Sequence, residues 1–201
     1  MSDPYDDLRG SRNFQPSGND AESMEEFFSR CEDPWRLKDL ARHGPRIEIF
    51  RAMLQQHGPK FRRLLDIGCA EGFITYHLHD LSEFTLGIDV SPTAIQRAIR
   101  DYGRTCSFEV GGISDFRPDE PFDAVVITGV LYYLSDQRQL INENVSLYLA
   151  SGGLLLISHI KESSGHTGFV ELFDPERFQL ITSKEFPCDE YDQSLHLFRK
   201  R

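Results

Sequence analysis

The sequence predicts an α/β fold, a doubly wound, mostly parallel seven-stranded sheet that ends in a C-terminal antiparallel hairpin. Three observations support this fold. From residue 62 onward, short and nearly continuous apolar runs alternate with amphipathic stretches, as expected for strands that helices cover on both faces. The last two apolar runs have no helical stretch between them, which is typical of an antiparallel pair. The 201 residues are enough for one domain with a sizeable core and too few for two.

The chain before the predicted sheet is expected to contain a flexible tail and two helices. Residues 1–20 combine Gly, Pro, Ser, Asn and Asp with little apolar surface to bury. Residues 21–31 have an amphipathic pattern that ends at the Asp-Pro-Trp sequence of residues 33–35. A second helix is predicted over residues 44–58, with Pro45 at its start and a Gly-Pro pair at its end.

Within the predicted sheet, the local signals fix the order of the elements. Ser91 and Pro92 are a typical N-cap and first residue of a helix. Apolar residues at helical spacing, followed by a Gly-Gly pair, mark the last helix. We expect strands over residues 62–68, 84–90, 106–110, 122–128 and 154–159, helices over residues 73–80, 91–103 and 136–153, and the hairpin over residues 178–186 and 189–198.

Composition narrows the function classes. A net charge of −10 disfavours binding to a phosphate backbone, so no nucleic-acid partner is expected. No apolar run approaches the ~20 residues of a membrane helix, and the polar N-terminus has no signal core, so we expect no membrane association and a cytoplasmic protein. The cysteines are scattered without CxxC spacing, and His77 and His79 have no third ligand nearby. We therefore expect no metal site and reduced structural thiols.

The stretch LLDIGCAEG, residues 64–72, places small residues where a predicted strand passes into a helix. Gly68 allows a sharp turn and a close approach to a ligand, and Gly72 opens the helix. Asp89 ends the next strand, at the position from which an acid accepts hydrogen bonds from ribose hydroxyls. Glycines and an acid also end ordinary βα units, but here the whole order of elements matches a nucleoside-cofactor site.

The same turn argues against a dinucleotide. A G-x-G-x-x-G sequence is absent, since Ala70 stands where the second glycine would fall. Asp66 adds a carboxylate that disfavours a pyrophosphate and tolerates a cationic ligand. A nicotinamide-dependent oxidoreductase is therefore the weaker interpretation.

In this turn the chain resembles the class I S-adenosylmethionine-dependent methyltransferases. LLDIGCAEG is similar to their first motif, LGIDVSPTAIQRA to their ribose-binding strand and following helix, FDAVVITGVLYYL to their fourth-strand motif and LASGGLLLIS to their fifth strand. The resemblance implies a Rossmann-like core over residues 61–201, lid helices over residues 21–60, and the cofactor S-adenosyl-L-methionine. It implies cofactor contacts from Trp35, Arg46, Asp66, Gly68, Cys69, Gly72, Asp89, Val90, Ile113, Asp115 and Thr128.

These residues carry different expected roles. The glycines would cradle the methionine part of the cofactor, Asp66 would act on its ammonium, Asp89 on the ribose and Val90 on the adenine. Gly112 stands where the family has an adenine-binding acid, which leaves either Asp115 or the backbone N–H of Ile113 to replace it.

Two further residues precede the predicted core. The resemblance implies that Arg46 pairs with the cofactor carboxylate, a role that a planar guanidinium suits. Trp35 would cover the site, and simple core packing is the alternative for this single tryptophan.

A narrower resemblance is to the nodulation-type N-methyltransferases, which methylate the free amine of a chitooligosaccharide. DPWRL, GCAEGFIT and VLYYL carry it. These enzymes have an acid just before VLYYL, and here that position is Gly129, which removes the expected base. The resemblance therefore implies methyl transfer to an amine or hydroxyl of a small molecule, with the acceptor left open.

Methyl transfer from a sulfonium mainly requires positioning, so no catalytic motif is obligatory. Three residues are candidates. His159 ends the fifth predicted strand and titrates near neutrality, and His166 lies in the following loop. Tyr132 and its neighbour Tyr133 follow the fourth strand and line either the pocket or the core. A hydrogen-bonded structural histidine is the alternative for His159.

A non-catalytic alternative remains. Glycines at positions 112 and 129, where acids are expected, are compatible with a methyltransferase-like partner or scaffold subunit. A protein or nucleic-acid substrate is less expected, because the acidic chain has only a short insert after the fifth strand.

Overall fold

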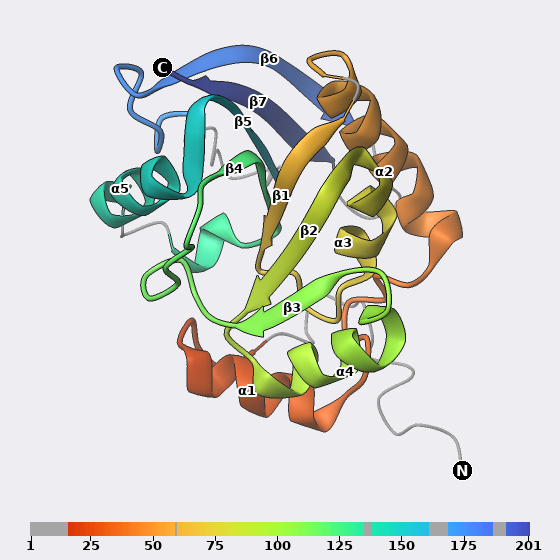
Figure 1. Ribbon diagram of the computed structural model, residues 1–201. Coiled ribbons are helices and arrows are strands. Elements are labelled where there is room, and N and C mark those ends of the chain that lie inside the picture. The colour runs from red at the N-terminus through yellow and green to blue at the C-terminus, as the bar shows by residue number, and fades with distance from the viewer. Residues whose placement is uncertain (1–15, 59, 135–137, 161–168, 187–191) are drawn as a thin grey trace.

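A computed structural model gives the structure of the chain and describes residues 16–58, 60–134, 138–160, 169–186 and 192–201. Most of the predicted N-terminal tail lies outside these ranges. Seven strands in the described residues form one sheet in the order β3-β2-β1-β4-β5-β7-β6 (Figure 1). The strands are β1 (Phe61–Ile67), β2 (Ser82–Asp89), β3 (Ser107–Val110), β4 (Phe122–Thr128), β5 (Leu149–Ile160), β6 (Phe178–Phe186) and β7 (Gln193–Lys200).

The predicted α/β sheet is confirmed in its topology. Strands β1 to β5 pair in parallel, and β7 pairs antiparallel with both β5 and β6. The chain runs outward from β1 through β2 to β3 and then returns to β4 on the other side of β1. This reversal places a switch point at the carboxyl ends of β1 and β4, where ligands bind in doubly wound sheets.

Five α-helices surround this sheet in the described residues: α1 (Ala21–Arg30), α2 (Leu40–Gln55), α3 (Phe73–Leu78), α4 (Pro92–Tyr102) and α5 (Arg138–Tyr148). Apolar residues of α2 and α3 pack on one face of the sheet and those of α5 on the other. Helix α1 lies against α4 beyond the carboxyl ends of β2 and β3 (Figure 1). The cap of α4 is as predicted, since the Ser91 hydroxyl accepts a hydrogen bond from the Ala94 N–H.

The predicted start of the second helix was wrong. Helix α2 begins at Leu40, four residues before the predicted Gly44, because the Asp39 carboxylate accepts hydrogen bonds from the N–H groups of Ala41 and Arg42 at 3.0 and 3.3 Å. Pro45 therefore lies inside the helix and not at its first residue. The side-chain cap outweighed the local preference of proline for the first turn.

Two other predicted helix ends were too late. Helix α5 ends at Tyr148, and the residues up to Gly153 already belong to β5, where Leu149 pairs with Phe122 across a register irregularity. Helix α3 ends at Leu78 and continues as a 3₁₀ turn. No helix in the described part of the chain is long and apolar enough to cross a membrane.

Candidate functional site

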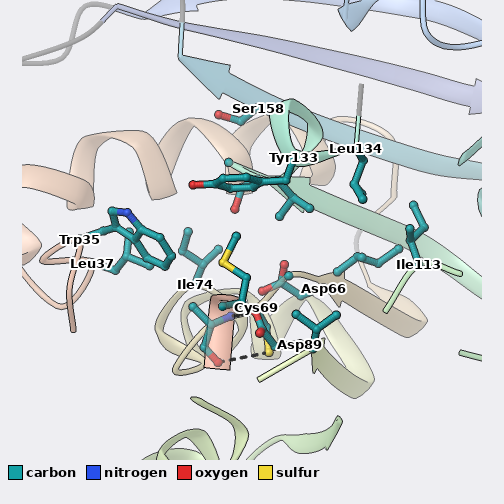
Figure 2. Close-up of a pocket in the computed structure, with 18 of the residues that line it drawn as sticks. Trp35, Leu37, Asp66, Cys69, Ile74, Asp89, Ile113, Tyr133, Leu134 and Ser158 are labelled. Carbon is teal, nitrogen blue, oxygen red and sulfur yellow. Dashed lines mark hydrogen bonds between the residues drawn. The ribbon is translucent and has the colours of Figure 1, made fainter. Parts of the chain in front are cut away.

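A cavity of about 470 Å³ lies at the carboxyl ends of β1, β2, β4 and β5, a size that suits a small ligand or cofactor. Figure 2 shows Tyr133 and Ser158 on one side of it and Asp66, Cys69 and Asp89 on the other. The structure brings together at this cavity most of the predicted site residues: Trp35, Arg46, Asp66, Gly68, Cys69, Asp89, Val90, Ile113, Asp115, Thr128 and His159.

Gly68 forms the tightest part of the turn between β1 and α3. Its φ is 72°, in the left-handed region. A Cβ at this position would lie 2.2 Å from the Val130 side chain. The N–H groups of Gly68 and Cys69 both donate to the Ile88 carbonyl, at 2.8 and 2.9 Å, which fixes the turn against β2. Only glycine therefore fits between the turn and the segment after β4.

Gly72 opens helix α3, as predicted from the sequence. It is the N-cap of α3 with a φ of 79°, and a Cβ there would lie 2.7 Å from the Phe108 ring of β3. Gly72 does not belong to the lining of the cavity. In the structure it turns the chain into α3 and allows β3 to pack closely.

Asp66 is the second-last residue of β1, lies at the wall of the cavity and is almost fully buried. Its Oδ2 accepts a hydrogen bond from the Thr75 hydroxyl at 2.6 Å, and its Oδ1 is buried without a hydrogen-bond partner in the described residues. Burial raises the pKa of Asp66 to about 6, against the opposing effect of the Thr75 hydrogen bond. An unsatisfied carboxylate oxygen beside a cavity favours a cationic or hydrogen-bond-donating ligand.

Asp89 ends β2 and closes the other side of the turn. Its two oxygens accept hydrogen bonds from the Ala70 N–H at 2.9 Å and the Ser91 N–H at 3.0 Å. Burial raises the pKa of Asp89 to about 6, while these two hydrogen bonds lower it. Each carboxylate oxygen has a second lone pair, so Asp89 retains acceptor capacity toward the cavity.

The segment after β3 forms the end of the cavity where Ile113 lies in Figure 2. The Asp115 carboxylate accepts a hydrogen bond from the Gly112 N–H at 2.8 Å. A Cβ at Gly112 would lie 3.0 Å from Val90 and 3.1 Å from the Asp115 carboxylate. Asp115 thus occupies the space that a larger residue at position 112 would need. The choice between Asp115 and the Ile113 N–H as the adenine-binding group stays a prediction.

Trp35 and Leu37 lie at the opposite end, in the segment between α1 and α2 (Figure 2). The Trp35 ring also packs on Phe27 and Phe28 of α1, with ring centroids 5.0 and 5.3 Å apart. Packing and site lining, which the sequence left as alternatives for Trp35, therefore occur together.

Arg46 projects from α2 into a buried polar cluster at the cavity. Its Nη1 donates to the Gln193 side-chain oxygen at 3.3 Å, and the Ser158 hydroxyl donates to the same oxygen at 3.1 Å. The guanidinium also lies over the Phe50 ring, and its charge lowers the pKa of Asp66. A fixed cation thus stands near the Asp66 carboxylate.

His159 lines the cavity, but its ring nitrogens have contacts elsewhere. Nδ1 lies 3.2 Å from the Ile160 carbonyl oxygen, and Nε2 lies 3.3 Å from Nε2 of His196, whose Nδ1 lies 2.8 Å from the Ser183 hydroxyl. One set of neutral tautomers satisfies all three contacts. Burial lowers the pKa of His159, and burial also lowers the pKa of His196 to about 4. This arrangement favours a structural histidine over a general base.

The other two catalytic candidates cannot be placed. The side chain of Tyr132 and the whole of His166 lie outside the described residues. Tyr133 lines the cavity, and burial raises its pKa to about 12, so its phenol stays neutral.

His43, a buried residue of α2 that lines the cavity, was not among the predicted site residues. Neither of its ring nitrogens has a hydrogen-bond partner of normal geometry in the described residues. Burial and the charges of Arg46 and Arg42 lower its pKa to about 4, so the ring is neutral. The available signal was its spacing of three residues from Arg46 on one helix face, which was hidden because the helix was predicted to begin after His43.

Known proteins resemble this chain in sequence and in overall structure. The family model described as a methyltransferase domain matches residues 60–194. Nodulation protein S of Rhizobium tropici is 31% identical over 142 residues, which make up 67% of this chain and 58% of that protein. Nodulation protein S of Sinorhizobium fredii (strain NBRC 101917 / NGR234) is 32% identical over 149 residues, or 70% of this chain and 67% of that protein.

A solved structure extends the similarity over more of the chain. The N-methyltransferase NodS from Bradyrhizobium japonicum WM9, in complex with S-adenosyl-l-homocysteine, has a TM-score of 0.75 and 27% identity. The match covers 90% of this chain and 98% of that one. The chain therefore belongs to the methyltransferase domain family, as a member of the class I S-adenosylmethionine-dependent methyltransferases.

Proposed function

We propose that this protein transfers a methyl group from S-adenosylmethionine to the amine of a small molecule. The observation that carries the proposal is the 470 Å³ cavity at the switch point of the sheet, with the buried carboxyl groups of Asp66 and Asp89 on one wall. The solved N-methyltransferase that resembles this chain over almost its whole length supports the same activity. That the acceptor is a small molecule, and that its nitrogen is the methylated atom, are both parts of this proposal.

The residues of the cavity fit S-adenosylmethionine. The Oδ1 of Asp66, which has no hydrogen-bond partner in the described residues, suits its ammonium group, and Arg46 suits its carboxylate. The acceptor capacity of Asp89 suits the ribose hydroxyls, and the Gly68 cradle leaves room that a Cβ would fill. Val90, with Ile113 and Asp115 beyond it, would surround the adenine.

When bound, S-adenosylmethionine supplies an activated methyl group on a positively charged sulfur. The contribution of the protein is then to hold the acceptor nitrogen in line with that methyl and to exclude water, which is worth about 7–11 kcal/mol when the geometry is right. The acceptor amine must be uncharged to react. The neutral groups of His43, Tyr133 and Ser158 line the cavity and would receive it without adding charge.

The residues before the sheet complete the proposed site. Residues 21–60 would act as a lid, because Met24, Phe28 and Trp35 line the cavity from outside the core of residues 61–201. Gly129, with a φ of 69°, stands where the nodulation-type enzymes have an acid, so the amine would lose its proton to solvent or to a group outside the motif. We place this reaction in the cytoplasm, where scattered cysteines such as the buried Cys31, Cys69 and Cys106 are kept reduced.

The proposal is tested by calorimetric titration of the full chain with S-adenosylhomocysteine, on wild type and on Asp89→Ala. Micromolar binding that Asp89→Ala loses is the expected result. Amino sugars and other small amines, with matched hydroxyl analogues, are then incubated with S-adenosylmethionine and examined by mass spectrometry for one added methyl group. Absence of binding to the wild type would contradict the enzymatic function, and binding without transfer to any acceptor would favour the non-catalytic partner.

A further inference from the structure

Strained backbone in the described part of the chain is concentrated at one joint. The residues other than glycine with a left-handed backbone there are Asp33, Arg36 and Ala70, with φ values of 47°, 53° and 50°. Asp33 and Arg36 belong to the segment between α1 and α2, and Ala70 belongs to the Gly-rich turn. Such conformations are unfavourable for these residues and persist only where surrounding contacts hold them.

The contacts that hold this joint converge on Glu71, whose side chain is 5% exposed. Its Oε1 accepts hydrogen bonds from the Asp33 N–H and from Arg97 Nη1, both at 2.9 Å. Its Oε2 forms an ion pair with Lys38 Nζ at 3.0 Å. The Asp33 carboxylate in turn accepts hydrogen bonds from the N–H groups of Leu37 and Lys38, at 2.7 and 3.1 Å. Glu71 therefore holds the start and the end of the segment that carries Trp35.

The two cations that contact Glu71, Arg97 and Lys38, also link it to helices α1 and α4. Arg97 of α4 also donates to the carbonyl oxygens of Phe28 and Cys31, both at 2.9 Å, at the end of α1. Lys38 also forms an ion pair with Asp101 at 2.9 Å. Burial lowers the pKa of Lys38, but its contacts with Asp101 and Glu71 outweigh this effect and raise it above the usual range. The carboxylate of Glu71 is thus compensated on both oxygens.

Glu71 does not belong to the cavity lining, whereas its neighbour Ala70 and the wall residues Trp35 and Leu37 do. We propose that Glu71 is a positioning residue that couples the Gly-rich turn to the Trp35 wall, so that the wall retains a ligand held by the turn. The inference rests on the proposed function only for the identity of that ligand, S-adenosylhomocysteine in the test below.

The test uses Glu71→Gln, which keeps the shape and one acceptor oxygen but removes the charge facing Arg97 and Lys38. Glu120→Gln is the matched control, because Glu120 forms an exposed ion pair with Arg62 before β4, at the end of the strand away from the cavity. Trp35 is the single tryptophan of the chain, so its fluorescence reports directly on the wall. Stopped-flow displacement of S-adenosylhomocysteine gives the dissociation rate for each protein.

We expect Glu71→Gln to release S-adenosylhomocysteine about tenfold faster than wild type, and Glu120→Gln to match wild type. Amide hydrogen exchange in the ligand-free protein should rise in residues 33–38 and stay unchanged in β4. Lys38→Met, which removes one partner of Glu71, should change both readouts in the same direction by less.

Dissociation within twofold of wild type would overturn the inference, and so would an equal rise of exchange in β4, which indicates general destabilisation. If the wild type binds no S-adenosylhomocysteine, the proposed function fails instead. The exchange of residues 33–38 in Glu71→Gln then decides alone whether Glu71 holds the joint.

Discussion

At the scale of single residues, Gly68 and Ala70 of the Gly-rich turn differ in whether a Cβ methyl group fits at their position. Gly68 has no space for one, because its Cβ would lie 2.2 Å from Val130. We expect Gly68→Ala to destabilise the protein by about 2–4 kcal/mol, from overpacking together with a left-handed backbone. Denaturant unfolding and titration with S-adenosylhomocysteine measure the loss of stability and of binding. Stability within 0.5 kcal/mol of wild type, as is ordinary for a surface change, would contradict the assignment.

Ala70 supplies the control for that variant. It already has a φ of 50°, so Ala70→Gly removes left-handed strain while adding freedom to the unfolded chain. The two effects are each about 1 kcal/mol and opposite in sign. We expect Ala70→Gly to keep both stability and ligand binding, which separates a requirement for glycine from a general sensitivity of the turn.

Asp66 is expected to contribute to ligand binding while it lowers the stability of the ligand-free protein. Its pKa of about 6 exceeds the usual 3.8, so the folded protein is penalised for ionising it at neutral pH. Asp66→Asn should therefore raise the free energy of unfolding of the ligand-free protein by about 2 kcal/mol at pH 7, and the gain should shrink as the pH falls toward 4. Denaturant unfolding from pH 4 to 7 measures this difference. Titration should show weaker binding of S-adenosylhomocysteine, and a variant that is both less stable and equally tight would contradict the role.

At the scale of elements, helix α2 decides which side chains reach the cavity. His43 lies on it buried, with a contact to the Trp35 backbone that falls outside regular hydrogen-bond geometry, and a poorly satisfied buried group costs about 1–3 kcal/mol. We expect His43→Leu to raise the stability of the ligand-free protein by about 1 kcal/mol and to lower methyl transfer about tenfold or more. Unfolding and turnover assays on the same preparation test both effects. Full turnover in His43→Leu would show that the ring has no contact with the acceptor.

The elements also show what the sequence could predict. Alternation of apolar and amphipathic stretches was sufficient to predict a doubly wound, mostly parallel sheet with a C-terminal hairpin, because a crossover between parallel strands has few solutions. The caps were less reliable. Ser91 was predicted to cap α4 and does so in the structure. The start of α2 depends on Asp39, but in the sequence Pro45 was the stronger signal for a helix start. Local preference loses to a side-chain cap when the helix also packs on the sheet.

The part of the site that lies at the Gly-rich turn and the adjacent strand ends was predictable from the sequence. Asp66 and Asp89 lie at the carboxyl ends of β1 and β2, and Gly68 follows β1 directly, so their place at the carboxyl edge of the sheet follows from the fold. The role of Gly72 was less clear, because its packing against Phe108 depends on a strand that follows much later in the chain. Gln193 accepts from Arg46 and Ser158 because β7 pairs with β5, and no local pattern in the sequence signals these contacts.

At the scale of the whole molecule, a chain of net charge −10 keeps two carboxyl groups buried in a single cavity. Burial raises the pKa of both Asp66 and Asp89 to about 6. The buried histidines act in the opposite sense, since burial lowers the pKa of His43 and His196 to about 4 and also lowers that of His159. As the pH falls below the pKa that these histidines have in the unfolded chain, their burial lowers the free energy of unfolding. As the pH falls below about 6, the two buried carboxyl groups raise it. The net stability therefore does not report on the site, but ligand affinity does.

We accordingly expect the affinity for S-adenosylhomocysteine to fall as the pH drops below about 6, because protonated carboxyl groups no longer attract its ammonium or accept from its ribose hydroxyls. Two groups titrating together give a limiting slope of about two logarithmic units of affinity per pH unit, and one group gives about one. Calorimetry from pH 5 to 8 on wild type and Asp66→Asn measures both slopes. Asp66→Asn should lose one unit of slope and keep the remainder, which belongs to Asp89. An affinity that stays constant to pH 5 in both proteins would mean that neither carboxylate contacts the ligand, and the polar anchors of the cofactor would then have to be sought among Arg46 and the backbone of the turn.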